Sequence, residues 1–448
     1  MRTDSAPDAS AWRRPVAPMP AAPRTLEESG LSFDQVLQLA IKLLHVGGDM
    51  TGADLAGRLG LRYSVIEPVL HSLRSSYLCE VQGGGLVGGP SFLFRATDNG
   101  RARAMLFLEQ NRYVGAAPVP FRQYERYMRT FDEQAPRRVT RAQVERALAH
   151  LVLGDRVLDQ LGPAVNGGHS LFVYGPPGNG KTVIAQSVKN LLEGDIAVPF
   201  AIEQDGHLVQ VFDPVVHEGR PAPPLDELDA GDQPDGRWLR CRRPLVTVGG
   251  ELTLGALELA IDAAAGYYRA PIQLAANGGV LVIDDFGRQR CSAVELLNRW
   301  ITPLESRTDY LTLMSGQKLP VPFVVLVVFA TNIRPMDLVD EAFLRRIHYK
   351  VFAENPTAAQ FTEIFARCCR ERGVDFDEAM VERLVTGQLR HRGIALRGCQ
   401  PRDLLDHAVA LADYRGLPHC LTDGLLEAAC DSYFLDDEIA RRVSGDAS

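Results

Sequence analysis

The chain has 448 residues, of which 46% are hydrophobic and 23% are charged, and its net charge is -8 at pH 7. This composition excludes fibrous and wholly disordered chains, and the length predicts a globular protein of about two to four domains. The longest apolar run, from Val321 to Ala330, is too short for a membrane span, so we expect no membrane insertion. Eight cysteines occur without a Cys-x-x-Cys pair, which argues against a zinc site or a disulfide framework and favours a cytoplasmic protein.

The N-terminal part of the chain divides into a tail and a compact segment. Residues 1–30 alternate alanine and proline with arginine, and we expect a disordered tail. In residues 31–114, Thr51 has the pattern of a helix N-cap, Gly60 makes a turn, and a second apolar helical stripe follows. Two strand-like segments flank a glycine-rich loop: residues 77–81 and 91–96, with the loop at 83–89. This segment resembles a winged helix, an α+β domain.

The charge of this segment leaves the kind of partner open. Winged helices either read DNA through their second helix or dock proteins. Here the second helix offers Arg62, His71 and Arg74 against Glu67, and residues 31–114 carry eight Arg or Lys against seven Asp or Glu. Because a nearly neutral surface supplies little attraction to phosphate, a protein client or adaptor is expected and DNA remains possible.

The rest of the chain predicts a linker, an α/β domain and a helical domain. Residues 115–139 are proline-rich, which predicts a linker. Through residues 140–354 strands then alternate with helices, a pattern that predicts a parallel sheet with crossover helices. An insertion at about 199–243 interrupts this pattern, with a hairpin expected from residues 198–202 and 207–212 and an exposed loop after it. Residues 355–448 have helical periodicity only.

A phosphate-binding loop is the strongest motif in the sequence. The apolar strand Leu171–Tyr174 runs into a segment of the form Gly-x-x-x-x-Gly-Lys-Thr, and a helix follows. Backbone N–H groups of such a loop converge on phosphate oxygens, its lysine reaches the β- and γ-phosphates, and its threonine ligates magnesium. The candidate nucleotide-binding residues are Gly175, Pro176, Pro177, Gly178, Asn179, Gly180, Lys181 and Thr182.

Two carboxylates follow a second apolar strand. The run Gly279–Ile283 is typical of a central strand buried on both faces, and it ends in Asp284 and Asp285. Beside a phosphate-binding loop, the first carboxylate would hold Mg²⁺ together with Thr182, and the second would polarise the attacking water.

Further candidate site residues lie at the end of a third strand and near two later helices. The apolar strand beginning at Phe323 ends in Asn332, where ligands of open α/β sheets bind. Arg345 and Arg346 follow a short helix, and Arg402 comes just after Pro401 in the first turn of another. Arginine suits long-range contacts with phosphate because its charge is permanent and its fork is planar.

These motifs in this order resemble an AAA+ ATPase over residues 140–448. The resemblance implies a five-stranded parallel sheet with a C-terminal helical lid, ATP and Mg²⁺ as cofactors, and a homo-oligomeric ring, commonly a hexamer. It implies that the loop is a Walker A motif and that Asp284 and Asp285 belong to Walker B. Asn332 would be sensor 1, Arg346 or else Arg345 the arginine finger, and Arg402 sensor 2.

One departure and one extra hairpin refine the resemblance. The commonest Walker B ends in Asp-Glu, whereas Asp285 is one methylene shorter, which could slow hydrolysis. Residues 310–314 and 318–321 look like the presensor hairpin of the branch that contains magnesium chelatases and enhancer-binding activators. Three functions follow as hypotheses: a ring ATPase that remodels a protein client or complex, a DNA-binding ATPase that uses the winged helix, and a slowly hydrolysing, nucleotide-gated scaffold.

Overall fold

The structure is a computed structural model that describes residues 18–82, 89–134, 139–168, 170–220, 233–338 and 341–434. Outside these ranges lie residues 1–17 of the expected disordered tail, residues 83–88 of the glycine-rich loop and residues 221–232 of the exposed loop in the insertion. No helix in the described ranges is both long enough and apolar enough to cross a membrane.

The chain forms two compact units whose boundaries differ from those expected. The first unit contains Met1–Arg138, Leu192–Val282 and Arg288–Val327, and the second contains Val139–Leu191, Ile283–Gly287 and Val328–Ser448. The expected α/β domain of residues 140–354 is therefore divided, and the helical segment 355–448 groups with the phosphate-binding loop. The reason is strand pairing, since inserted residues pair with a strand of the N-terminal part, Val119 with Ile202 and Pro120 with Glu203.

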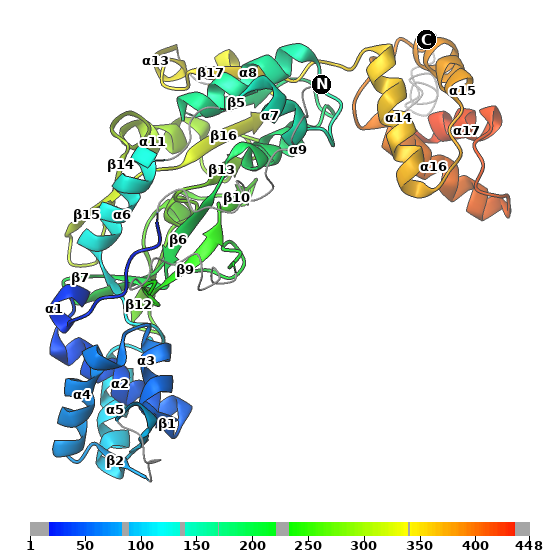
Figure 1. The fold of residues 1–448 in the computed structure, drawn as a ribbon. Helices are drawn as coiled ribbons and strands as arrows, with labels where there is room; N and C mark the ends of the chain where they lie inside the picture. Colours follow the sequence, from blue (N-terminus) through cyan, green and yellow to red (C-terminus); the bar gives the residue numbers. More distant parts are fainter. Residues whose placement is uncertain are drawn as a thin grey trace, which may run out of the picture. The chain divides into compact units, whose positions relative to one another are not determined.

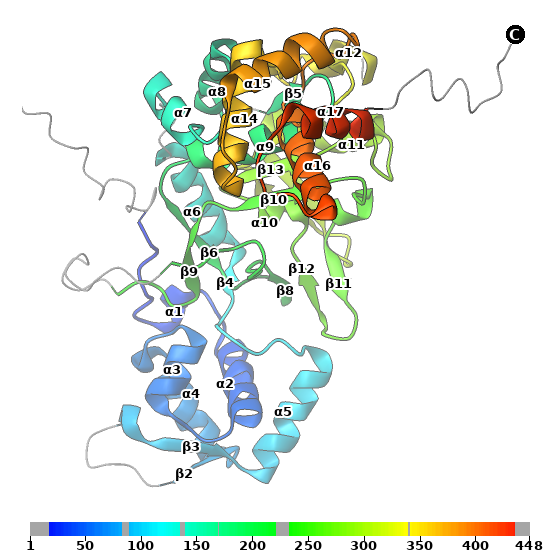
Figure 2. The ribbon, with the colours of Figure 1, turned by 90° about the vertical axis from the view of Figure 1, so that its right-hand side faces the viewer.

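Helices and a small antiparallel sheet make up the beginning of the first unit. The helices α2 and α5 pack against each other, with the strands β2 and β3 beside them (Figure 2). Capping boxes start two of the helices, Ser32 with Gln35 and Thr51 with Asp54. The elements are α2 Phe33–Gly47, β1 Met50–Thr51, α3 Gly52–Leu59, α4 Tyr63–Ser75, β2 Cys79–Val81, η2 Gly89–Ser91, β3 Leu93–Ala96 and α5 Asp98–Gln110, and the strand order is β1-β3-β2.

Residues 18–30, assigned to a disordered tail from the sequence, are ordered. They contain a short helix, α1 (Leu26–Ser29), with Thr25 as its N-cap. The backbone N–H of Ala22 donates to the Gln233 carbonyl over 2.8 Å, and Ala22 and Ser29 are buried. Composition could not predict this, because the partner lies about two hundred residues further along the chain.

Residues 115–134 of the expected linker (115–139) are also an ordered part of the first unit. They form β4 (Val119–Pro120) and α6 (Phe121–Gln134). One face of α6 is aromatic and buried, and the Tyr124 ring stacks on Trp238 with their centroids 6.3 Å apart. Because large aromatic side chains contribute strongly to core burial, this helix belongs to the core.

The inserted segment contributes two strands to a sheet that is larger than the hairpin expected. Strands β7 and β8 do form an antiparallel hairpin, but Val198 and Pro199 belong to β6, which pairs with β9. The larger sheet has the strand order β11-β12-β8-β7-β4. Its strands and the pair beside it are β6 Asp195–Pro199, β7 Ala201–Gln204, β8 His207–Gln210, β9 Trp238–Arg242, β11 Ala260–Asp262 and β12 Tyr267–Arg269.

Apart from strands of the two five-stranded sheets, the elements between residues 254 and 322 are short helices, one long helix and a hairpin. The strands β14 and β15 pair antiparallel from Thr308 with Pro322 to Thr312 with Lys318, where the sequence predicted a hairpin. The elements are η5 Leu254–Leu257, α10 Ile272–Ala275, α11 Ala293–Ser306, β14 Thr308–Thr312 and β15 Lys318–Pro322.

A second five-stranded sheet carries the phosphate-binding loop, and with its helices it confirms the predicted α/β class (Figure 1). Its strand order is β10-β13-β16-β5-β17, and β5 runs parallel to both β16 and β17. The rings of Phe172, Phe286 and Phe329 pack together with centroids 5.0–5.8 Å apart. The strands are β5 Leu171–Tyr174, β10 Leu245–Val248, β13 Val280–Ile283, β16 Leu326–Thr331 and β17 Tyr349–Phe352.

The described part of residues 355–448 is helical and has its own core. Phe361, Phe365, Leu404 and Leu405 are fully buried in it. We call the helices from α14 to α17 the lid: α14 Ala358–Arg372, α15 Glu378–Arg383, the π-helical η6 Leu384–Leu389, α16 Gln400–Arg415 and α17 Asp423–Tyr433. The other helices of the second unit are α7 Arg141–Ala147, α8 Asp155–Gly167, α9 Lys181–Ser187, η3 Val188–Leu191, α12 Pro335–Leu338 and α13 Glu341–Leu344.

Candidate nucleotide site

The phosphate-binding loop connects the end of β5 to the start of α9, and its glycines are required by its geometry. Gly175, Gly178 and Gly180 have φ angles of 150°, 83° and 68°, which side chains rarely allow. A Cβ at Gly175 would lie 2.5 Å from the Ala353 carbonyl oxygen. The loop can therefore turn tightly enough to direct its backbone N–H groups toward one point.

Lys181 and Thr182 begin the helix that follows the loop. The Lys181 ammonium donates to the Pro176 carbonyl over 2.8 Å, and the residue is only 8% exposed. Burial lowers the pKa of Lys181, while the negative charges of Asp285 and Asp284 oppose that shift. A buried lysine held against the loop by these contacts suits an anionic ligand.

The threonine hydroxyl and the first of the two carboxylates after β13 lie in contact. Thr182 Oγ1 is 2.9 Å and 2.8 Å from the two carboxylate oxygens of Asp284. Mg²⁺ prefers oxygen ligands and is usually bound by one or two carboxylates together with substrate phosphates. This hydroxyl and carboxylate fit that preference. In the described ranges no group of three or more His, Cys, Asp or Glu could hold a metal ion on its own.

The second carboxylate lies beside the sensor 1 candidate. Asn332 Nδ2 donates to Asp285 Oδ1 over 3.1 Å, and Asp285 has a positive φ of 47°. The turn after β13 is held to β16, because Phe286 N donates to the Ala330 carbonyl and Thr331 Oγ1 donates to the Phe286 carbonyl, both over 2.8 Å. These bonds bring two polar residues from separate strands to the same edge of the sheet.

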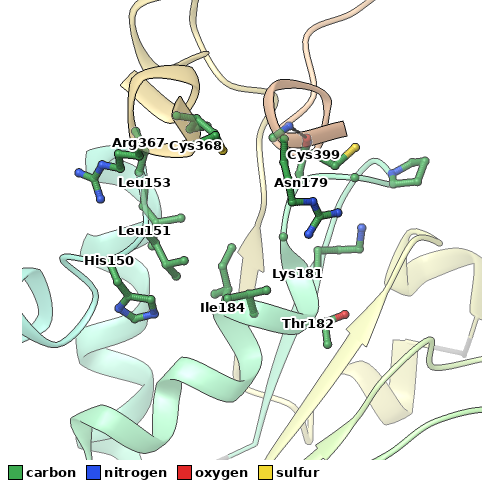
Figure 3. A pocket seen from close by; sticks show the side chains of 18 of the residues that line it. His150, Leu151, Leu153, Asn179, Lys181, Thr182, Ile184, Arg367, Cys368 and Cys399 are labelled. Atoms are coloured by element: carbon green, nitrogen blue, oxygen red, sulfur yellow. Dashed lines mark hydrogen bonds between the residues drawn. The ribbon is translucent and has the colours of Figure 1, made fainter. Parts of the chain in front are cut away.

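A cavity of about 520 Å³ joins these residues to the lid. Figure 3 shows Lys181 and Thr182 on one side of it, His150, Leu151 and Leu153 on the other, and Ile184 between them. The lining combines the expected phosphate-binding residues with an apolar end, and it includes Gly178, Asn179, Gly180, Lys181, Thr182, Asp284, Asp285, Asn332, Ile184, Ile364 and Arg402.

The three candidate arginines differ in their positions. Arg402 lines the cavity, and its guanidinium lies 3.0–3.1 Å from Asp403 Oδ1. Arg345 is exposed, Arg346 is half-buried, and neither lines the cavity. The structure thus brings Arg402 together with the loop and the carboxylates, and it leaves the pair at 345–346 outside the cavity of its own chain.

Several lining residues were not singled out from the sequence. They come from the segment before α8 and from α14 of the lid: His150, Leu151, Val152, Leu153, Ile364, Arg367, Cys368 and Glu371. The apolar run 151–153 between two helices is the one local signal that could have drawn attention to them. Their convergence depends on tertiary contacts, such as the bond from Arg367 Nη1 to the Ala149 carbonyl.

Comparison with known families gives two partial matches. Residues 154–199 match the family described as magnesium chelatase, subunit ChlI, and residues 357–432 match a domain of unknown function, DUF8689. No curated protein matches the chain.

Solved structures resemble the chain only loosely. The Holliday junction branch migration motor RuvB of Thermotoga maritima is 16% identical, with 64% of this chain and 72% of that chain covered and a TM-score of 0.37. NtrX from Brucella abortus in complex with ATP is 14% identical, with 69% and 61% covered and a TM-score of 0.38.

The sheet, the glycine loop and the paired hydroxyl and carboxylates define a P-loop nucleotide-binding protein. The magnesium chelatase match covers the loop and the helix after it, and it supports an AAA+ P-loop ATPase domain without resolving a subfamily.

Proposed function

We propose that the chain binds ATP with Mg²⁺ in the cavity of the second unit and hydrolyses it. The observation that carries this proposal is the convergence of Lys181, Thr182, Asp284, Asp285 and Asn332 on one cavity. These residues come from three separate strand ends of a parallel sheet, the place where ligands of such sheets bind.

Each residue of this group has a role that follows from its contacts. Thr182 and Asp284 would hold Mg²⁺, which supplies charge neutralisation on the β- and γ-phosphates. Lys181 neutralises phosphate charge from the loop side. Asp285 accepts a hydrogen bond from Asn332, so the two can orient a water molecule for attack on the γ-phosphate.

We further propose that turnover requires a ring of identical chains, in which an arginine of one chain reaches the γ-phosphate bound to the next. Arg346 is our first candidate for this finger and Arg345 the second, and their position outside their own chain's cavity supports a role in trans. Arg402 on the lid would contact phosphate within its own chain.

The residues 31–114 would then serve as a winged-helix domain that docks a protein client or adaptor, which the ring remodels. The exposed face of α4 supports a protein partner over DNA, because it carries Glu67 and Pro68 beside His71 and Arg74. A proline and a carboxylate on this face offer no donors to phosphate.

Steady-state ATP turnover per subunit, measured across a range of protein concentrations, tests this function. Lys181→Ala should remove ATP binding, whereas Lys189→Ala, a lysine eight residues further that does not line the cavity, should not. Turnover that rises with concentration supports the trans arginine. Stimulation by duplex DNA at low salt would favour the DNA-binding alternative, and tight ATP binding without turnover would favour a nucleotide-gated scaffold.

A further inference from the structure

Asn179 occupies a position that the phosphate-binding motif leaves free, yet its side chain is buried and fully bonded. It is 9% exposed. Its Nδ2 donates to Asn355 Oδ1 over 2.8 Å and to the Ala353 carbonyl over 3.3 Å, and its Oδ1 accepts from Gly398 N over 3.2 Å. An amide with both donors and its acceptor used is held in one orientation.

These partners lie on the segment that enters the lid and on a loop inside the lid. Ala353 and Asn355 lie between β17 and α14, where the chain enters the lid. Gly398 lies just before α16, the helix that carries Arg402. One side chain of the loop therefore contacts both the entry to the lid and the segment that positions its cavity-lining arginine.

Two further bonds extend the same contact. Cys399 N donates to the Gly178 carbonyl over 2.8 Å, so the backbone of the loop is bonded to the segment before α16. Arg397 Nη1 lies 3.4 Å from Asn355 Oδ1, the same oxygen that accepts from Asn179. We call this set the loop–lid clasp: Gly178, Asn179, Ala353, Asn355, Arg397, Gly398 and Cys399.

We propose that Asn179 is a positioning residue that transmits phosphate binding in the loop to the lid and so places Arg402 over the nucleotide. This inference rests on the proposed function. Phosphate binds the backbone N–H groups of the loop, and a loop ordered by phosphate holds the Asn179 amide and its three bonds in place. The lid is then coupled to the loop directly as well as through the nucleotide.

A purely structural role is the competing explanation, and the chain offers a matched control for it. Asn277, in the first unit, is 5% exposed and is bonded in the same way. Its Nδ2 donates to Tyr124 Oη and the Pro322 carbonyl, and its Oδ1 accepts from Val324 N, each over 2.8 Å. Asn277→Ala removes an equally buried, equally bonded amide that does not touch the loop.

The experiment uses the full-length protein and two readouts, hydrogen–deuterium exchange with and without ATP and Mg²⁺, and the separate ATP Kd and kcat. In the wild type, ATP should slow exchange at residues 175–182 and at residues 397–403. Asn179→Ala should keep the first protection and lower the second about fivefold or more, with kcat about tenfold lower and Kd changed by less than about threefold. Asn277→Ala should lower the melting temperature without changing either protection.

Variants of Asn355 test the contact with the lid without changing the loop, because Asn355 is exposed and lies outside the phosphate-binding motif. Asn355→Ala should reproduce part of the Asn179→Ala effect, and Asn355→Asp, which still accepts from Asn179 Nδ2, should restore the wild-type values. The double variant Asn179→Ala, Asn355→Ala should lower kcat and the protection of residues 397–403 no further than Asn179→Ala alone does.

The inference is overturned if Asn179→Ala retains ATP-dependent protection at residues 397–403, or if its effect equals that of Asn277→Ala. Failure of the proposed function has a different signature. In that case ATP would protect neither region of the wild-type protein, and both the function and the coupling would be wrong.

Discussion

The two ends of the proposed nucleotide cavity are built in different ways. At the phosphate end, Gly175 to Thr182 are consecutive. Asp284 and Asp285 directly follow β13, and Asn332 directly follows β16 of the same sheet. At the opposite end, residues 150–153 meet Ile184 and the lid residues Ile364, Arg367 and Cys368. A local motif specifies the first end, whereas only folding assembles the second.

This difference predicts unequal sensitivity to substitution. The phosphate end supplies charges and donors whose interactions with phosphate are strong and directional. The lid end supplies apolar area, which is spread over several side chains. Substitutions at the phosphate end and in the proposed finger should therefore stop turnover, and those at the lid end should weaken binding by smaller factors.

The largest loss of turnover is expected when the proposed finger arginine is removed. This arginine would reach the phosphate end of the cavity in a neighbouring chain. Arg346→Ala should lower turnover by about 10³-fold, because a finger arginine stabilises the charge of the transition state. ATP binding by the isolated chain should not change, as measured by equilibrium titration at low protein concentration.

Arg345→Ala is the matched control for this variant. If Arg345→Ala stops turnover and Arg346→Ala does not, the finger is Arg345. If neither variant changes turnover, the proposal that an arginine of one chain reaches the nucleotide bound to the next chain is wrong.

The second largest effect is expected from the carboxylate that orients water. Asp285→Asn should lower kcat by about 10²-fold, because an amide cannot accept the proton of the attacking water. ATP affinity should stay within about threefold of the wild type, since Thr182 and Asp284 are unchanged. Asp337→Asn, a carboxylate of α12 outside the cavity, is the control. A wild-type kcat for Asp285→Asn would remove the residue from the mechanism.

A smaller effect is expected from the lid arginine. Arg402→Ala should lower kcat by about tenfold, because one charge-assisted contact to phosphate is lost. Arg372→Ala is the matched control, since Arg372 is a lid arginine that also pairs with an aspartate, Asp406, and does not line the cavity. Equal losses in the two variants would show that lid stability, and not phosphate contact, is responsible.

The smallest effect is expected at the apolar end. Ile364→Ala should raise the ATP Kd by about threefold with kcat unchanged, because it removes part of an apolar wall. Ile394→Ala, at a half-buried lid position outside the cavity, should leave Kd unchanged. A Kd change of about 10²-fold for Ile364→Ala would contradict the contrast between the two ends.

Part of the fold was predictable because its signals are local. The α/β class followed from apolar strands that alternate with helices, and the loop at 175–182 followed from glycine spacing. The hairpin at 308–322 was visible as two strand-like runs about a Ser-Gly turn. The domain boundaries were not predictable, since the inserted strands pair with β4 from about eighty residues earlier in the chain.

The sequence by itself predicted the phosphate-binding loop and the polar residues that follow the other strands, because each motif needs only a strand, a turn and the residues after it. Tertiary structure alone decided how residues 18–30 and 115–134 are ordered and which apolar residues close the cavity. It also decided that Asn179 bonds both to the segment that enters the lid and to the loop before α16. The physical reason is the distance along the sequence over which each effect acts. Backbone preference and periodicity act over a few residues, whereas burial and hydrogen bonding join segments that the sequence separates by tens to hundreds of residues.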